Sequence, residues 1–204
     1  GNWEQAVNAT AGQVMMQGGN AIKAWFSSTH GGYIFSSGEI GWSGTSWTKH
    51  ASDFSGSVNS FAELSSKSYD KESSWFYCDW GSRAQYNKTA WLKPEELADI
   101  VNSILLVQSD GSADAHILQT DKSDPDTWNE DKVRQELSKY RTSFNSISSG
   151  HVDVDFGTGR TTRVYFSGNA GSVDFPADAF KKYFNLRAPS NINIVGPLFN
   201  IEIK

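Results

Sequence analysis

The chain has 204 residues, a formal net charge of −5 and a pI near 5.3. An acidic chain lacks the positive surface field that attracts nucleic acids and anionic membranes, so we expect neither as its main partner. Cys78 is the only cysteine, which excludes an internal disulfide and a cysteine-rich metal site within the chain. No apolar run approaches the roughly 20 residues that cross a bilayer, so we expect no membrane span. The length fits one domain, although a two-lobed layout stays open.

The first part of the chain predicts a hairpin followed by a long irregular region. The amino-terminal residues 1–3 are close to a strand pattern. Residues 13–17 and 21–26 predict two strands, joined by a turn at Gly18-Gly19-Asn20. Residues 33–80 are rich in serine, glycine and aromatic residues and show little helical periodicity. Long irregular regions usually carry function, so we expect the site there.

Two helices are predicted in the middle of the chain. Pro94 opens the first, which has an acidic first turn and an apolar face formed by Leu97, Ile100, Val101, Ile104 and Leu105. The second begins at Thr127, where Thr127 and Glu130 have capping-box spacing. Val133, Leu137 and Tyr140 are expected on one side of this helix.

Strands dominate the predictions for the last part of the chain. Residues 161–167 and 172–175 predict two strands joined by a turn at 168–171, and Pro176 opens a short helix. Residues 199–204 alternate strictly, which predicts a strand with one buried face. The whole pattern predicts a mixed α+β fold, with a β-rich core and peripheral helices.

The loop after the first predicted hairpin has the composition of a ligand-binding segment. Ser27, Ser28 and Thr29 supply donors and acceptors, and His30 can carry a proton near neutral pH. Gly31-Gly32 permits backbone angles and close contacts that other residues do not. A polar turn between strands is the alternative interpretation.

Aromatic residues are unusually dense after this loop, which favours carbohydrate binding because the apolar faces of sugars stack on indole and phenol rings. We expect Tyr33 and Trp42 to offer such surfaces. Asp79 and Arg83 lie four residues apart beside other aromatics and could hold a ligand or pair with each other. A second hydrophobic cluster is the alternative role for the rings.

Candidates for catalysis are few. Glycosidic cleavage needs an acid that protonates the leaving oxygen. Glu39, between Gly38 and Ile40, is the best-placed carboxyl group for this role, although it is a weak candidate. The aspartates between 110 and 126 do not have the spacing of a helix-loop-helix calcium site. We expect no metal and no cofactor. A thiol peptidase built on Cys78 is a remote alternative.

Two groups of segments resemble one known family. Residues 6–10 (Ala-Val-Asn-Ala-Thr), 12–14 (Gly-Gln-Val) and 24–32, which end in His-Gly-Gly, are similar in order and spacing to the middle of a SpoIID domain. This is the family of stage II sporulation protein D and the LytB amidase enhancer. Residues 159–164 and 184–187 (Phe-Asn-Leu-Arg) resemble its closing strand and Leu-Arg segment. Residues 53–150 match only loosely.

The resemblance implies an extracytoplasmic protein of the bacterial cell wall or cell surface, of the lytic transglycosylase type, which cleaves the glycan strands of peptidoglycan. The family's catalytic glutamate lies upstream of the Ala-Val-Asn-Ala-Thr segment, in a helical region that has no counterpart here. We therefore expect residues 1–204 to be a single SpoIID-like domain without its upstream catalytic segment, with residues 27–30 lining a glycan groove. The alternative is a non-catalytic module that binds the cell wall or stimulates a cell-wall amidase.

Overall fold

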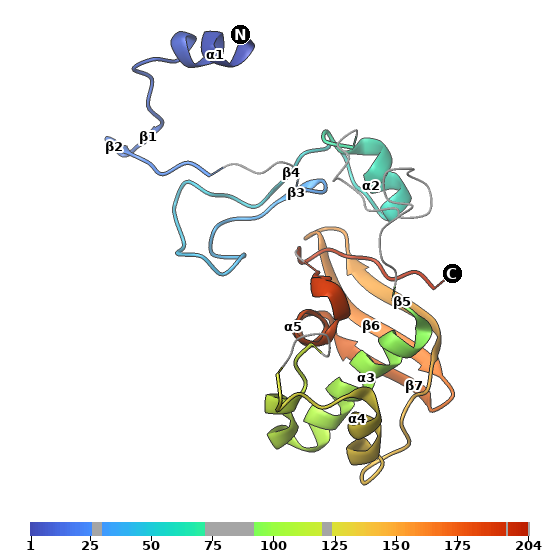
Figure 1. Cartoon of the computed structure of the whole chain (residues 1–204). Helices are drawn as coiled ribbons and strands as arrows, with labels where there is room; N and C mark the ends of the chain where they lie inside the picture. The colour runs from blue at the N-terminus through green and yellow to red at the C-terminus, as the bar shows by residue number, and fades with distance from the viewer. Residues whose placement is uncertain (26–29, 72–91, 120–123, 195, 204) are drawn as a thin grey trace. The chain divides into compact units, whose positions relative to one another are not determined.

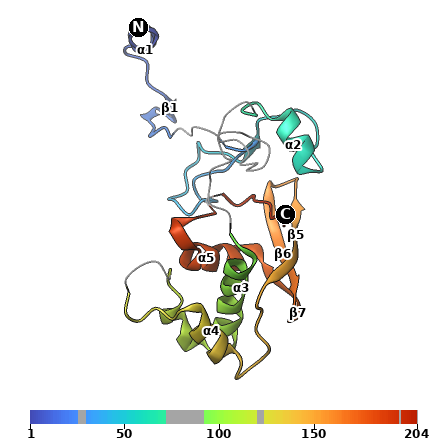
Figure 2. The same ribbon diagram turned by 45° about the vertical axis from the view of Figure 1, so that its right-hand side comes forward.

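A computed structural model describes the chain at residues 1–25, 30–71, 92–119, 124–194 and 196–203. The chain divides into two compact units, Gly1–Asp79 and Trp80–Lys204, which are described separately below. Figures 1 and 2 show the ribbon from two directions. Among the described residues, no helix combines the length and the apolar character needed to cross a membrane.

The amino-terminal unit consists of short elements joined by irregular segments. They are α1 (Asn2–Ala9), β1 (Met16–Gln17), β2 (Asn20–Ala21), β3 (Tyr33–Ile34), β4 (Ala51–Ser52) and α2 (Phe61–Lys67). β1 pairs with β2 and β3 pairs with β4, both antiparallel. No residue of α1 is buried. The buried apolar side chains described in this unit are Tyr33, Val58 and Leu64, which lie in β3, before α2 and in α2.

The carboxy-terminal unit packs helices against an antiparallel sheet. Its elements are α3 (Pro94–Ser109), the 3-10 helix η2 (Gly111–His116), α4 (Glu130–Leu137), β5 (Ile147–Asp155), β6 (Arg160–Gly168), β7 (Gly171–Pro176), α5 (Ala177–Arg187) and the 3-10 helix η3 (Pro189–Asn191). The strand order is β5-β6-β7. Val164 of the central strand β6 lies opposite Val152 of β5 and Phe175 of β7. Helix α3 contacts α4, α5 and β5, and α5 contacts β6 and β7.

Helix α3 lies in the core of this unit. The predicted apolar face of α3 is buried, and it packs in one cluster with Phe166, Phe175 and Phe180 from the sheet and α5. Asn102, also buried on α3, donates to the carbonyl of Phe144 and accepts from its N–H, both at 2.8 Å. Since a buried amide costs free energy unless its hydrogen bonds are made, this reciprocal pair makes the polar residue compatible with the core.

The mixed α+β prediction is confirmed, and so is the helix that begins at Pro94, but this helix lies in the core and not at the periphery. The second predicted helix exists, but it begins at Glu130 because Asn129, and not Thr127, is its N-cap. The side chain of Asn129 accepts from the N–H of Lys132 at 2.9 Å. Tyr140 lies beyond the end of α4, so its expected place on the helix beside Val133 and Leu137 is wrong.

Strand predictions hold for β6 and β7 and fail at the chain ends. β6, β7 and α5 lie where they were expected. Residues 199–203 are not a strand, because Phe199 bonds through its N–H and C=O to the hydroxyl of Thr161 instead of joining a ladder. The near-strand pattern at the amino terminus is the helix α1. In the described part of the expected hairpin, residues 13–25, the strands are only the short β1 and β2.

Candidate functional site

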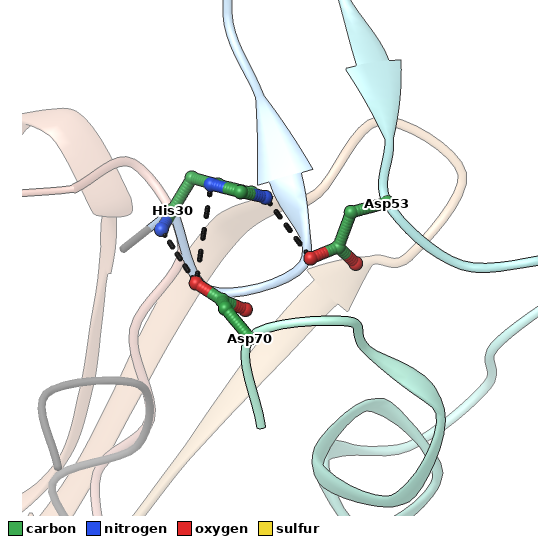
Figure 3. Close-up of side chains that lie close together, drawn as sticks. All are labelled: His30, Asp53 and Asp70. Carbon is green, nitrogen blue, oxygen red and sulfur yellow. Dashed lines mark hydrogen bonds and ion pairs between the residues drawn. The ribbon is translucent and has the colours of Figure 1, made fainter. Parts of the chain in front are cut away.

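Three titratable side chains from distant parts of the sequence meet in the amino-terminal unit: His30, Asp53 and Asp70 (Figure 3). One side-chain nitrogen or oxygen of each residue lies within 4.8 Å of such an atom in each of the other two. Because Asp53 lies 23 positions and Asp70 lies 40 positions from His30 in the sequence, only the fold brings the three together.

The pairing of β3 with β4 places His30 beside Asp53. Tyr33 lies opposite Ser52 in this ladder, and the N–H of Asp53 donates to the carbonyl of Gly32 at 3.1 Å, just beyond it. The ring nitrogen Nε2 of His30 lies 2.9 Å from Oδ2 of Asp53. A carboxylate at this distance orients the imidazole.

The end of α2 supplies Asp70. This helix begins where the hydroxyl of Ser60 accepts from the N–H of Glu63 at 3.1 Å, a standard N-cap. Just after its last turn, the hydroxyl of Ser68 donates to the carbonyl of Leu64 at 2.8 Å. Two residues later, Oδ2 of Asp70 accepts from the backbone N–H of His30 at 2.8 Å and lies 3.9 Å from Nδ1 of the ring. Asp70 therefore fixes the backbone of His30, while Asp53 fixes its ring.

Gly32 is required for this packing. Its φ of +88° belongs to the left-handed region, and an added Cβ would lie 2.5 Å from Oγ of Ser68 and 2.6 Å from Cδ1 of Leu64. The missing side chain therefore lets α2 approach β3. We expected Gly31-Gly32 to allow close approach of a ligand, and for Gly32 that expectation is wrong, because the residue is buried under α2.

The site holds more negative than positive charge in a largely buried setting. The side chains of Asp53 and Asp70 are only 7% and 11% exposed, and that of His30 is 24% exposed. Oδ1 of Asp53 is buried and has no hydrogen-bond partner among the described residues. The arrangement can supply nitrogen and oxygen ligands to a cation.

The two residues predicted to stack on sugars differ in their exposure to solvent. Tyr33 is 2% exposed and packs edge-on against Phe54, with ring centroids 5.3 Å apart, so its expected role as a stacking surface is wrong. Trp42 is 54% exposed and lies 5.6 Å from the ring of Trp25, which is 37% exposed. We call Trp25 and Trp42 the indole pair.

Hydrogen bonds within the loop before β4 hold Trp42 in place. The N–H of Trp42 donates to the carbonyl of Ser37 at 2.9 Å. The hydroxyls of Ser37, Thr45 and Thr48 bond to one another at 2.7–3.2 Å. Nε1 of Trp47 donates to the carbonyl of Lys23 at 3.2 Å, which ties this loop to the segment that carries Trp25. The indole pair therefore stands on an internally bonded support.

Glu39, the weak catalytic candidate, belongs to the same loop. Its Oε2 accepts from the N–H and the hydroxyl of Ser36 at 2.8 and 2.7 Å, and its Oε1 lies 3.0 Å from Nδ1 of His50. A general acid must present its own proton to the substrate, whereas this carboxylate accepts from loop donors. Its contacts fit a loop-stabilising residue better than a proton donor.

The other predicted binding residues, Ser27, Ser28, Thr29, Asp79 and Arg83, lie outside the described residues. Sequence reasoning selected His30 and missed both of its carboxylate partners. No spacing rule connects them, since Asp53 becomes a neighbour through the β3–β4 pairing and Asp70 through the packing of α2 on Gly32. The predicted aromatic role did point to Trp42, although its partner Trp25 was missed.

A shallow pocket of about 220 Å³ lies in the carboxy-terminal unit, at the start of α5. Arg160, Thr162, Pro176, Asp178 and Pro197 are among its lining residues. None of the residues predicted to bind a ligand lines this pocket.

Comparisons of this chain with protein-family models, with curated proteins and with solved structures found no match. The resemblance to the SpoIID family therefore rests on the sequence segments described above.

Proposed function

We propose that this chain is a glycan-binding domain of the SpoIID type, which holds peptidoglycan strands against the indole pair. The observation that carries the proposal is the exposure of both Trp25 and Trp42 at a ring separation of 5.6 Å. Large exposed aromatic side chains that contact each other are uncommon on a surface without a partner, because they leave apolar area in water.

The chemistry of the indole pair suits a sugar chain. The rings meet at 50°, so they present two differently inclined apolar faces, on which the C–H faces of successive sugar residues could stack. The hydroxyls of Ser37, Thr45 and Thr48 in the supporting loop are neutral, in accord with a ligand that is bound by stacking and uncharged hydrogen bonds. The acidic balance of the chain speaks against a polyanionic ligand.

A rigid support strengthens such binding. The hydroxyls that bond to one another in the loop of Trp42 reduce the conformational freedom that the loop would lose on binding a glycan. Preorganisation of this kind raises affinity by lowering the entropic cost of association.

Binding without cleavage is the version that this chain supports best. The resemblance assigns cleavage to a glutamate upstream of the Ala-Val-Asn-Ala-Thr segment, and Glu39 is engaged by Ser36 and His50. We therefore propose that cleavage, as a lytic transglycosylase, belongs to a longer protein that contains such a glutamate. Residence at the bacterial cell wall and a role in stimulating an amidase remain predictions from the resemblance.

The test is co-sedimentation of the purified chain with insoluble peptidoglycan. We expect the wild-type chain to pellet with the polymer, and Trp42→Ala and Trp25→Ala each to reduce the bound fraction severalfold. Trp3→Ala is the matched control, because Trp3 is 84% exposed and lies on α1, away from the indole pair in sequence. Wild-type protein that stays in the supernatant, or equal losses in all three variants, would overturn the proposal.

Cleavage is tested separately with denuded glycan strands. We expect this chain to release no anhydro-muropeptides under conditions in which a lytic transglycosylase does so. Release that is abolished by Glu39→Gln would restore Glu39 as a catalytic residue and contradict the version stated here.

A further inference from the structure

We propose that His30, Asp53 and Asp70 bind one divalent transition-metal ion, of the Mn²⁺ or Zn²⁺ kind. The proposal does not depend on glycan binding, because it concerns side chains that are largely buried beside β3, β4 and α2, and not the exposed indole pair (Figure 3).

The first argument is electrostatic. An oxygen of Asp53 and an oxygen of Asp70 lie within 4.8 Å of each other, and both side chains are at least 89% buried. Two carboxylates in such a setting repel each other and lose hydration, and a protonated His30 compensates for only one of the two charges. A divalent cation would neutralise both carboxylates while the imidazole stays neutral.

The second argument is the unsatisfied oxygen of Asp53. This side chain is 93% buried, and while Oδ2 faces His30, Oδ1 has no hydrogen-bond partner among the described residues. Buried polar atoms are nearly always bonded, so one that is not calls for an explanation such as an ion. A carboxylate that ligates a cation through Oδ1, alone or together with Oδ2, would provide it.

The donor set indicates which cation. An imidazole nitrogen suits transition metals and is a poor ligand for Mg²⁺ and Ca²⁺, while two carboxylates suit Mn²⁺ and are also accepted by Zn²⁺. Metal–ligand bonds of about 2.0–2.2 Å put neighbouring ligand atoms roughly 3 Å apart. The 2.9 Å between Nε2 of His30 and Oδ2 of Asp53 already matches that spacing.

Asp70 completes the set with a small movement. Its Oδ2 is held by the N–H of His30 at 2.8 Å and lies on the Nδ1 side of the ring. A shift of its carboxylate would bring an oxygen from within 4.8 Å of the other two ligand atoms to the spacing of roughly 3 Å that a shared ion requires. Since three protein ligands leave coordination positions open, water or a ligand oxygen could fill the rest.

The experiment is isothermal titration of the metal-stripped full chain with MnCl₂ and with ZnCl₂, and with MgCl₂ for comparison. We expect one site per chain for Mn²⁺ and Zn²⁺ and at least tenfold weaker binding of Mg²⁺. Asp53→Asn, Asp70→Asn and His30→Gln should each weaken Mn²⁺ binding at least tenfold. Bound Mn²⁺ should also broaden the NMR signals of the His30 ring in the wild-type chain.

The matched control is His50→Gln, which removes an imidazole that also lies 3.0 Å from a carboxylate, that of Glu39. It should bind Mn²⁺ as the wild type does. Circular dichroism of each variant shows whether it is folded, and the broadening at His30 tests the proposal in the wild-type chain even where a variant unfolds. No binding of Mn²⁺ or Zn²⁺, or binding that leaves the His30 signals sharp, would overturn the proposal.

Discussion

Arg187 and Asp99 form a buried ion pair that joins α5 to α3 across 88 residues of sequence. Nε and Nη2 of the arginine donate to the two carboxylate oxygens at 2.6 and 3.0 Å, and Nη1 donates to the carbonyls of Leu118 and Trp128. The guanidinium is fully buried. The Leu-Arg segment that contributes to the SpoIID resemblance thus has a structural role in the carboxy-terminal unit.

Removing the acidic partner should destabilise this unit strongly. Asp99→Asn leaves the guanidinium of Arg187 buried without its counter-charge, which costs about 3–5 kcal/mol. Urea unfolding monitored by circular dichroism measures the change. The control is Asp174→Asn, because Asp174 pairs with Arg163 at 2.8 Å on the exposed face of the sheet and should contribute less than about 1 kcal/mol. Equal effects of the two variants would contradict the assignment.

Gly32→Ala should disrupt the packing of α2 against β3. The new methyl group would overlap Ser68 and Leu64, and its backbone would be strained at a φ of +88°. Strain and overlap together should cost about 2–4 kcal/mol. Gly41→Ala isolates the strain, because Gly41 has a φ of +81° and no atom within 4 Å of an added Cβ. We expect it to lose only about 1 kcal/mol; a Gly32→Ala loss no larger than this would show that α2 does not need the glycine.

The turn between β5 and β6 should be sensitive to acid. Three hydrogen bonds hold the pKa of Asp155 below its ordinary value of 3.8. The one from the hydroxyl of Thr158 contributes most, and those from the N–H groups of Gly157 and Thr158 add to it. A lowered folded-state pKa means that the charged form stabilises the fold above the unfolded-state pKa. That contribution is lost as the pH falls through the folded-state value.

Asp155→Asn tests this sign. The variant should be less stable than the wild type near neutral pH, and the difference should shrink as the pH falls below about 3.8. Thermal unfolding followed across the acid range measures it, with Asp114→Asn as an exposed control. A difference that grows on acidification would contradict the assignment.

How far the sequence predicts this fold depends on whether an element is specified locally. Pro94 and the apolar face that follows it define α3, because a helix start and a 3.6-residue period are local signals. The alternation at 199–204 is equally local, yet the described residues there form no strand, because the hydroxyl of Thr161 takes the bonds of Phe199. Tertiary contacts overrode the pattern.

The candidate site shows the same division. His30 and Trp42 could be selected from residue type and loop composition, since both stand in polar segments near glycines. Asp53 and Asp70 could not, because each reaches His30 only through strand pairing or helix packing. The prediction for Tyr33 failed for the same reason: its contact with the ring of Phe54 comes from the fold, and nothing local indicated it.

Glycan recognition by the indole pair is tested most directly by a double-mutant cycle. Wild type, Trp25→Ala, Trp42→Ala and the double variant are titrated calorimetrically with a soluble oligomer of N-acetylglucosamine and N-acetylmuramic acid. If both rings hold one sugar chain, each single variant should bind at least fivefold more weakly, and the double variant should lose less than the product of the two losses. Four equal affinities, or no binding by the wild type, would contradict the account.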